Sequence, residues 1–583
     1  MKKALSLILA LAMVLSMAAF GSSVAESTVT DFVVTTLTYG ENEVLVCYPT
    51  PNVADTIDLK RSCTAPIILV FGEGKYDEES AKAYALESGL AAIAANEGGS
   101  VCFVNPVGDA WSEADAEVYG TIIGSTDDSS TSDIANGIST SSNYFTGEVV
   151  QAISGSNSRA YIYGIGAGAD FVASNFVKPV VSSVTYGDGV TMTFDRTATA
   201  ITLVGATTAT GIEANDMTVM ADGCSDEVVA ALQAACGAVI VSETADFTAE
   251  YAQAGAYRRQ AGVLVPVFDW AAEGITEVVE SYEVTTSADN VTFAGTEKHT
   301  VNYVTYYAAD ADVAGGSLPL VLCFHGGGNT ALYEAQATQW PLIGKARGFI
   351  TVSVDLHYPN VTAAETVELI QHLEEEYSID ASRIYASGFS MGGVKSWDLY
   401  EQYPTLFAGL APMDATNEVG TDSFSNPVEN YNTATLVPTF WVGGEASPLP
   451  EMPFQAEKCV ARTAYLFQVN QVVKAYDCSF DAQDAWENPI WGVNGDLTYQ
   501  VTATDFTDST MTIELFASAD GKYYTALACA GNQSHEVYAR NSWAAYDFLS
   551  QFSRAEDGSI VISDVTYSMP ADDGSVTDNS YNK

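Results

Sequence analysis

The run Ile379-Asp-Ala-Ser-Arg-Ile-Tyr-Ala-Ser-Gly-Phe-Ser-Met-Gly-Gly393 decides the expected fold. Arg383–Ser387 has the pattern of a strand, and Val394–Tyr403 has the pattern of a helix. Between them, Gly388–Gly392 matches G-x-S-x-G, whose small residues permit a sharp turn that exposes a serine hydroxyl. A helix that begins directly after the serine also directs backbone N–H groups at developing negative charge. We therefore predict that Ser390 is a nucleophile.

A glycine-rich loop precedes this motif. His325-Gly-Gly-Gly328 follows the apolar strand pattern of Leu318–Phe324. Three glycines let a backbone approach a substrate closely and donate N–H groups to an oxyanion. We predict an oxyanion hole formed by the backbone of Gly327 and Met391, and we assign a structural role to the histidine of the loop.

One histidine follows the predicted nucleophile. His535 comes after the strand pattern Tyr523–Cys529 and before the helical pattern Trp543–Phe552. A hydrolase fold places its general base in the loop after the last strand, so His535 is the predicted base. The earlier histidines are expected at surface or loop positions: His299, His357 and His372.

The acidic member of a Ser-acid-His order should lie between Ser390 and His535. Glu445 is the predicted acid, because it sits in the exit turn of the strand pattern Thr435–Val442. Asp414, which follows the short strand Gly409–Met413, is the alternative. Two further candidates fit better in a Trp-rich loop over the site: Asp481 and Asp484.

The chain repeats its own plan. Ala65–Gly74 resembles Leu318–Gly328, and Ser158–Gly168 aligns without gaps on Ser382–Gly392. Apolar strands that alternate with helical stretches indicate βαβ units and a mostly parallel sheet. We expect an α/β fold with two domains of similar plan, each with a mostly parallel central sheet flanked by helices. The expected bounds are 1–25 for a signal peptide, 26–275 and 276–555 for the domains, and 556–583 for a polar tail.

The first copy lacks the chemistry of the second. Gly166 stands where the second copy has Ser390, and no histidine precedes His299. We interpret residues 26–275 as a degenerate, non-catalytic domain. A dinucleotide-binding turn is the weaker alternative, because the glycine spacing in Gly164–Gly168 does not fit it.

Composition excludes several classes of partner. The 583 residues are 47% hydrophobic and carry a formal net charge of −51. Such a charge repels nucleic acid and anionic membranes, and it favours neutral substrates. No zinc motif occurs among the nine cysteines and five histidines, so no metal or other cofactor is expected. Two cysteine pairs are close enough in sequence to form disulfides: Cys224 with Cys236, and Cys459 with Cys478.

The first residues have the pattern of an export signal. Lys2 and Lys3 precede an apolar run that ends near Phe20, and Ser23-Val-Ala25 offers small residues for cleavage after Ala25. No later stretch has the length of an apolar membrane span. We expect a secreted protein without a membrane span after cleavage.

Residues 318–328, 379–393 and 531–552 resemble the polyhydroxybutyrate depolymerase and feruloyl-esterase group of α/β hydrolases. The resemblance covers about residues 285–555 and implies a Ser-His-acid triad that cleaves esters through an acyl-enzyme. It implies a small or polysaccharide-linked ester as substrate, of feruloyl, acetyl or polyhydroxyalkanoate type. Where that group usually has an Asp after the acid-bearing strand, this chain has Gly443-Gly-Glu-Ala-Ser447. A serine peptidase of the same fold and a catalytically inert binding protein are the alternatives.

Overall fold

A computed structural model describes twelve segments of the chain: residues 32–49, 66–97, 99–125, 138–139, 153–154, 156–185, 189–260, 262–327, 329–480, 490–502, 509–563 and 580–582. These segments form two compact units. The first unit takes in residues up to 183 and 193–267, and the second takes in 184–192 and 268–583. The expected signal peptide and most of the expected polar tail lie outside the described residues.

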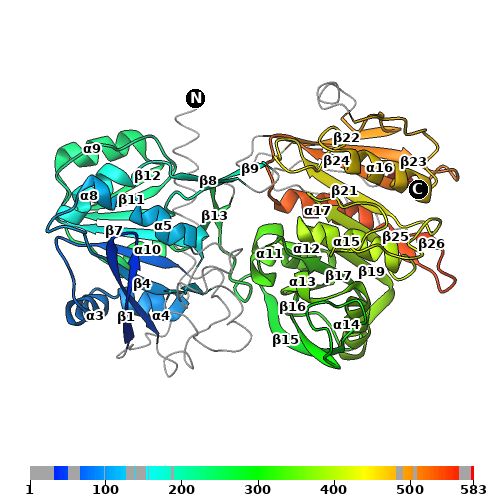
Figure 1. Ribbon diagram of the computed structural model, residues 1–583, viewed down its shortest axis with the longest axis horizontal. Helices are drawn as coiled ribbons and strands as arrows, with labels where there is room; N and C mark the ends of the chain where they lie inside the picture. The colour runs from blue at the N-terminus through cyan, green and yellow to red at the C-terminus, as the bar shows by residue number, and fades with distance from the viewer. Residues whose placement is uncertain are drawn as a thin grey trace. The chain divides into compact units, whose positions relative to one another are not determined.

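The first unit is built on an eight-stranded sheet (Figure 1). Two antiparallel pairings lie at one edge, β1 with β2 and β2 with β4, and every later pairing is parallel. In spatial order the strands are β1 (Phe32–Tyr39), β2 (Asn42–Pro49), β4 (Ser100–Val104), β3 (Ile67–Phe71), β7 (Ala160–Ile165), β10 (Ala200–Val204), β11 (Thr218–Asp222) and β12 (Ala238–Ser242).

The second unit contains a ten-stranded sheet of the same design. It starts with two antiparallel pairings, continues with parallel strands, and adds two antiparallel strands at the far edge. The order is β15 (Ile275–Thr285), β16 (Lys298–Ala308), β18 (Ile350–Val354), β17 (Leu318–Phe324), β19 (Ile379–Phe389), β20 (Gly409–Met413), β21 (Thr439–Gly444), β24 (Tyr523–Ala530), β23 (Thr510–Ala517) and β22 (Leu497–Thr502).

The two strand orders correspond position by position over eight strands, from β1 and β15 to β12 and β24. The shared order and directions confirm the expected fold class, two α/β-hydrolase-like domains with mostly parallel sheets. Four two-stranded sheets accompany them: β5 (Ile138–Ser139) with β6 (Ile153–Ser154), β8 (Val181–Thr185) with β9 (Thr191–Asp195), β13 (Tyr257–Gln260) with β14 (Val263–Pro266), and β25 (Phe552–Arg554) with β26 (Ile560–Ile562).

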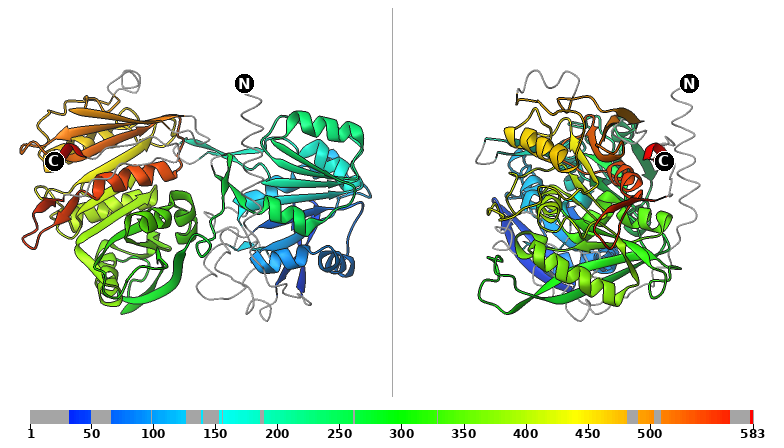
Figure 2. Two further views of the ribbon diagram at one scale, coloured as in Figure 1. Left: turned by 180° about the vertical axis from the view of Figure 1, so that it is seen from behind. Right: turned by 90° about the vertical axis from the view of Figure 1, so that its right-hand side faces the viewer.

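Helices cover both faces of each sheet because the central strands are apolar on both sides. In β17, Leu320 and Leu322 belong to one core cluster, and Val321 belongs to a second cluster on the opposite face. The first cluster includes residues of α14 (Ala363–Glu376), α15 (Met391–Gln402) and α16 (Glu457–Val469). The second includes residues of α11 (Ala331–Thr338), α12 (Trp340–Arg347) and α17 (Ala539–Leu549). Figure 2 shows α17, in red-orange, lying along the sheet of this unit.

The first unit has the same layered core. Ile67 and Leu69 of β3 face one cluster, and Ile68 and Val70 face the other. The helices of the first cluster are α5 (Val118–Ser125), α8 (Ala167–Asn175) and α9 (Asp226–Ala235). Those of the second are α3 (Glu78–Glu87), α4 (Leu90–Glu97) and α10 (Phe247–Ala254).

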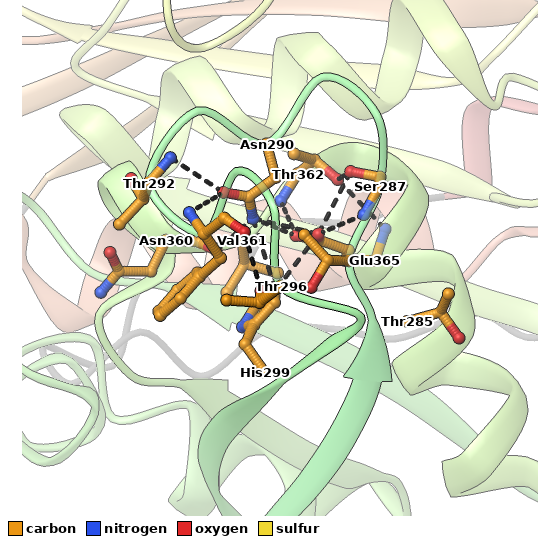
Figure 3. Close-up of polar contacts among 12 residues, drawn as sticks. Thr285, Ser287, Asn290, Thr292, Thr296, His299, Asn360, Val361, Thr362 and Glu365 are labelled. Atoms are coloured by element: carbon orange, nitrogen blue, oxygen red, sulfur yellow. Dashed lines mark hydrogen bonds and ion pairs between the residues drawn. The ribbon is translucent and has the colours of Figure 1, made fainter.

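A buried carboxylate ties the loop between β15 and β16 to the start of α14 (Figure 3). Glu365 accepts hydrogen bonds from the backbone N–H groups of Ser287 (2.9 Å) and Thr362 (2.8 Å) and from the amide of Asn290. His299 Nε2 lies 3.1 Å from the same carboxylate. His299 is only 6% exposed and lies within β16, so the expectation of a surface or loop position is wrong for it.

The eight cysteines in the described part of the chain are free thiols, so neither candidate pair is a disulfide. Cys102 and Cys323 are buried in their strands, as their apolar surroundings in the sequence indicate. Among the residues that the structure covers, no helix has both the length and the apolar character needed to cross a membrane. Within the same residues, no cluster of three or more His, Cys, Asp or Glu side chains is arranged to hold a metal ion.

Candidate active site

Ser390 occupies a sharp turn between β19 and α15. Its φ of 51° and ψ of −114° are a conformation that non-glycine residues rarely adopt, and they lift the serine out of the strand. The glycines on either side are required by close contacts. A Cβ at Gly388 would lie 2.4 Å from the backbone of Gly392, and one at Gly392 would lie 1.9 Å from the Phe324 carbonyl oxygen. The turn therefore packs tightly on β17 and leaves Ser390 at the carboxyl end of the sheet.

Ser390 and His535 meet at this edge, although 145 positions separate them in the sequence. His535 Nε2 lies 2.8 Å from Ser390 Oγ, at hydrogen-bond distance. The loop that carries His535 follows β24, and Phe389 packs against the imidazole with ring centroids 4.9 Å apart. The structure thus brings together the predicted nucleophile and the predicted base.

The carboxylate that contacts His535 is Glu451. Its Oε1 lies 2.5 Å from His535 Nδ1 and also accepts a hydrogen bond from Ser447 Oγ at 2.6 Å. Its Oε2 accepts the backbone N–H of Gly444 at 2.7 Å. The side chain is fully buried, so it depends on hydrogen-bond donors such as these. Glu451 is therefore held rigidly against the imidazole.

Glu445, the predicted acid, does not take this position. It lies directly after β21 as expected, but its Oε2 accepts the backbone N–H of Asn532 at 3.2 Å. The chain continues through Ser447-Pro-Leu-Pro450 and folds back, so that the later carboxylate reaches His535. The structure therefore has Glu451, and not Glu445, against the imidazole.

A sequence signal for Glu451 exists. It stands in Pro450-Glu-Met-Pro-Phe454, where apolar and proline residues flank a single charge. Met452 and Phe454 are buried in the core. A charge enclosed by core residues needs a polar partner. His535, the only histidine downstream of the predicted nucleophile, is a suitable partner. That argument favours Glu451 over a glutamate in an exit turn.

Asp414, the alternative acid, is buried at the end of β20. Its Oδ2 accepts a hydrogen bond from Gln533 Nε2 at 3.1 Å, and it does not contact His535. Asp481 and Asp484 lie outside the described residues. Trp491, from the same Trp-rich segment, is buried against Trp441 with ring centroids 5.1 Å apart, so this part of the segment belongs to the core.

The glycine loop lies beside the turn at Ser390. A Cβ at Gly327 would lie 3.2 Å from Met391 Cγ, so the two residues predicted for the oxyanion hole are neighbours. Gly328 lies outside the described residues. The loop is anchored by two imidazoles: His325 Nδ1 donates to the Gly326 carbonyl and His357 Nε2 donates to the His325 carbonyl, each at 2.7 Å.

Both anchoring imidazoles are buried and neutral. Burial lowers the pKa of His325 to about 4, and it lowers the pKa of His357 well below the usual range. His357 is 1% exposed in the short helix α13 (His357–Asn360), so it is not a surface residue. A group that binds protons so poorly does not suit a general base at neutral pH, and both residues act as supports of the loop.

The first unit contains the same turn without a nucleophile. Gly166 has φ 57° and ψ −120°, close to the angles of Ser390. A Cβ at Gly168 would lie 2.0 Å from the Phe71 carbonyl oxygen, which matches the contact of Gly392 with Phe324. Glu73 packs over the turn, since a Cβ at Gly166 would lie 3.2 Å from its Cγ. The first copy thus keeps the backbone of the site, without a nucleophile, and has the Glu73 side chain beside the turn.

Two curated proteins, an esterase and a depolymerase, share short similar stretches with the chain. The chain is 28% identical over 127 residues to the bifunctional acetylxylan esterase/xylanase XynS20E of Neocallimastix patriciarum, which is 20% of this chain and 18% of that protein. It is 28% identical over 114 residues to poly(3-hydroxyalkanoate) depolymerase C of Paucimonas lemoignei, 16% of this chain and 27% of that protein. The expected resemblance is confirmed.

The similar stretches are short. The chain spans less than a third of the length of either curated relative. No family model matches it. Among solved structures, it resembles an acetyl xylan esterase from Aspergillus awamori at 13% identity with a TM-score of 0.30, over 46% of this chain and 99% of that one.

Proposed function

We propose that the protein is an exported serine carboxylic-ester hydrolase whose second unit carries the reaction. The observation that supports this most directly is the chain of contacts from Ser390 Oγ through both imidazole nitrogens of His535 to Glu451. Nucleophile, base and acid in this arrangement are the working parts of a serine hydrolase. The short stretches shared with an esterase and a depolymerase favour an ester over a peptide as substrate.

In the proposed reaction, Ser390 Oγ attacks the acyl carbon while His535 Nε2 takes its proton. The developing oxyanion is stabilised by the backbone N–H groups of Gly327 and Met391, the latter at the first turn of α15. His535 then gives its proton to the leaving alcohol, which leaves an acyl group on Ser390. Water, activated by His535, releases the acid and restores the serine. Glu451 stabilises the imidazolium in both steps.

The proposed substrates are neutral esters, either small or linked to a polymer, of acetyl, feruloyl or polyhydroxyalkanoate type. The net charge of −51 disfavours polyanionic substrates through simple repulsion. The first unit has no histidine and no serine in its turn, so we assign it no part in the chemistry.

Hydrolysis of a short p-nitrophenyl acyl ester tests the proposal. Wild type should turn the ester over, and Ser390→Ala should lower kcat by at least about 1,000-fold, because no other group supplies the nucleophile. Ser382→Ala is the matched control, since Ser382 lies at the opposite end of β19 and bonds only within its own turn. It should retain wild-type activity.

The alternatives give different results. A serine peptidase would cleave peptides as well as the activated ester, with the same dependence on Ser390, whereas the proposed esterase should leave peptides intact. An inert binding protein would turn over neither class of substrate. Equal activity of wild type and Ser390→Ala would contradict the proposed nucleophile.

A further inference from the structure

A second buried carboxyl group lies next to Glu451. Asp414 ends β20, where its backbone N–H donates to the Val442 carbonyl at 2.9 Å and the N–H of Ser390 donates to the neighbouring Met413 carbonyl at 3.0 Å. Its φ is 51°, in the left-handed region that side chains other than glycine rarely adopt. Strained residues of this kind persist where the surroundings hold them, often at functional sites. Asp414 is 1% exposed.

The surroundings of Asp414 favour a proton on one of its oxygens. Oδ2 accepts from Gln533 Nε2, which can only donate. Oδ1 is buried and receives no hydrogen bond from the described residues. The Glu451 carboxyl lies within hydrogen-bond reach. Two ionised carboxylates in this position would repel each other, whereas a proton on Asp414 turns the contact into a charge-assisted hydrogen bond.

The charged groups that act on Asp414 are both negative. Glu451 approaches from the loop after β21, and Glu536 from the loop after β24. Burial, followed by the charge of Glu451, holds the pKa of Asp414 well above its usual range. The backbone N–H of Gly444 opposes this shift only in part. The neutral acid is therefore the form that the surroundings favour.

We propose that Asp414 is a positioning residue, whose carboxylic acid donates a hydrogen bond to Glu451 and so fixes the carboxylate that orients His535. The inference rests on the proposed function, because it concerns the same site. Asp414 also joins two loops. Gln533, which donates to Asp414, lies in the loop of His535, and Glu451 lies in the loop after β21. One neutral side chain thus links both loops and leaves a single negative charge beside the imidazole.

The variant Asp414→Asn tests this directly. Its amide can donate to Glu451 and accept from Gln533, but it cannot ionise. We expect kcat/KM at neutral pH within about 3-fold of wild type and an acidic limb of the pH profile shifted by less than about 0.3 unit. If Asp414 were charged in the native site, the substitution would remove a negative charge near His535 and lower the pKa of the acidic limb. Such a shift would overturn the inference.

Asp414→Ala removes the donor to Glu451 and one of the two acceptors of Gln533 Nε2, whose other acceptor is the Glu536 carbonyl. We expect kcat to fall by about 10-fold or more while KM changes little, since the effect acts through Glu451 and not on substrate binding. Equal kcat in the Ala and Asn variants would contradict the inference. Glu445→Gln is the control for loss of a nearby charge, because Glu445 bonds Asn532 and not Glu451. It should match wild type in both readouts.

An infrared difference spectrum does not depend on activity. Wild type minus Asp414→Asn should show the C=O stretch of a protonated carboxylic acid, and wild type minus Glu445→Gln should show none. Without that band the inference fails, even in an active esterase. If the band is present but no ester is hydrolysed, the proposed function is wrong, and the protonated Asp414 is still supported. Because this spectrum uses Asp414→Asn, it still tests the inference if Asp414→Ala does not fold.

Discussion

At the scale of single residues, the site depends on which carboxylate faces an imidazole nitrogen. Glu445 and Glu451 belong to the same loop after β21, carry the same functional group, and differ in the partners that the backbone gives them. Glu451 faces Nδ1 of His535, so it selects the tautomer whose Nε2 can accept the Ser390 proton. Glu445 faces a backbone N–H and has no influence on the tautomer.

Replacing these two residues should therefore have unequal effects. In Glu451→Gln, an amide N–H can face Nδ1 and favour the wrong tautomer, so we expect kcat on a p-nitrophenyl ester to fall by about 100- to 10,000-fold. Glu445→Gln should stay within about 3-fold of wild type. Steady-state kinetics of the two variants side by side check the prediction. If kcat fell as far in Glu445→Gln as in Glu451→Gln, Glu445 in the exit turn would again be the candidate for the acid.

At the scale of elements, the loop between β15 and β16 is held by α14 through one carboxylate. Burial alone would raise the pKa of Glu365, but hydrogen bonds from Ser287, Thr362, Asn290 and His299 outweigh it and hold the pKa below the usual range. The group therefore adds stability above the pKa that it has in the unfolded chain. This contribution is lost as the pH falls through the lower pKa of the folded state.

Glu365→Ala should leave several buried donors unpaired and destabilise the protein by about 3 kcal/mol at neutral pH. The penalty should shrink at an acidic pH below the lowered pKa of Glu365, where the wild-type carboxylate is protonated. Urea unfolding at the two pH values measures the difference. Glu368→Ala is the control on the same helix, because Glu368 only bonds the exposed Thr285. It should cost less than about 1 kcal/mol at both pH values.

At the scale of the whole molecule, the net charge of −51 is accompanied by buried acids that hold their protons. Burial, together with Asp222 beside it, raises the pKa of Glu250 to about 7. Burial likewise raises the pKa of Asp547 to about 7 and that of Asp355 to about 6. Each group binds more protons in the folded state than in the unfolded chain, so stability falls as the pH rises through these values.

We expect the Tm to be highest near about pH 5 and to decrease toward about pH 8. Glu250→Gln cannot ionise and should keep its hydrogen bond with Thr202, so the decrease should be smaller in this variant. Calorimetric scans of both proteins across the pH range provide the measurement. Parallel curves for wild type and Glu250→Gln would show that Glu250 does not carry the effect.

The fold and two members of the site could be predicted because their signals are local. Ser390 sits in a motif whose glycines are required by close contacts with the turn itself and with β17, and His535 has no competitor downstream. The acid could not be assigned in this way. The apolar and proline residues around Glu451 favour it as a buried acid. Its contact with His535, however, depends on how the loop after β21 folds back, and that path is held by bonds such as the one from the Gly444 N–H to Glu451.

Burial of isolated polar residues was equally hard to predict. His299 and His357 carry no apolar periodicity of their own, and they are enclosed by elements distant in sequence. The cysteine pairs failed for a related reason. Short separation along the chain does not bring two side chains together when each faces a different partner, as Cys236 faces Asn215 and Cys224 faces the Leu203 carbonyl. Tertiary packing decides such cases.

The Glu73 side chain over Gly166 has a consequence for the order in which mutations could restore a second site. Gly166→Ser alone meets Glu73 at 3.2 Å and should lower Tm, whereas Glu73→Ala followed by Gly166→Ser should cost only the backbone strain that Ser390 already bears. Melting curves of the two single variants and the double variant measure this coupling. A serine in the first unit is thus better accommodated once position 73 has changed, so the order of the two substitutions matters.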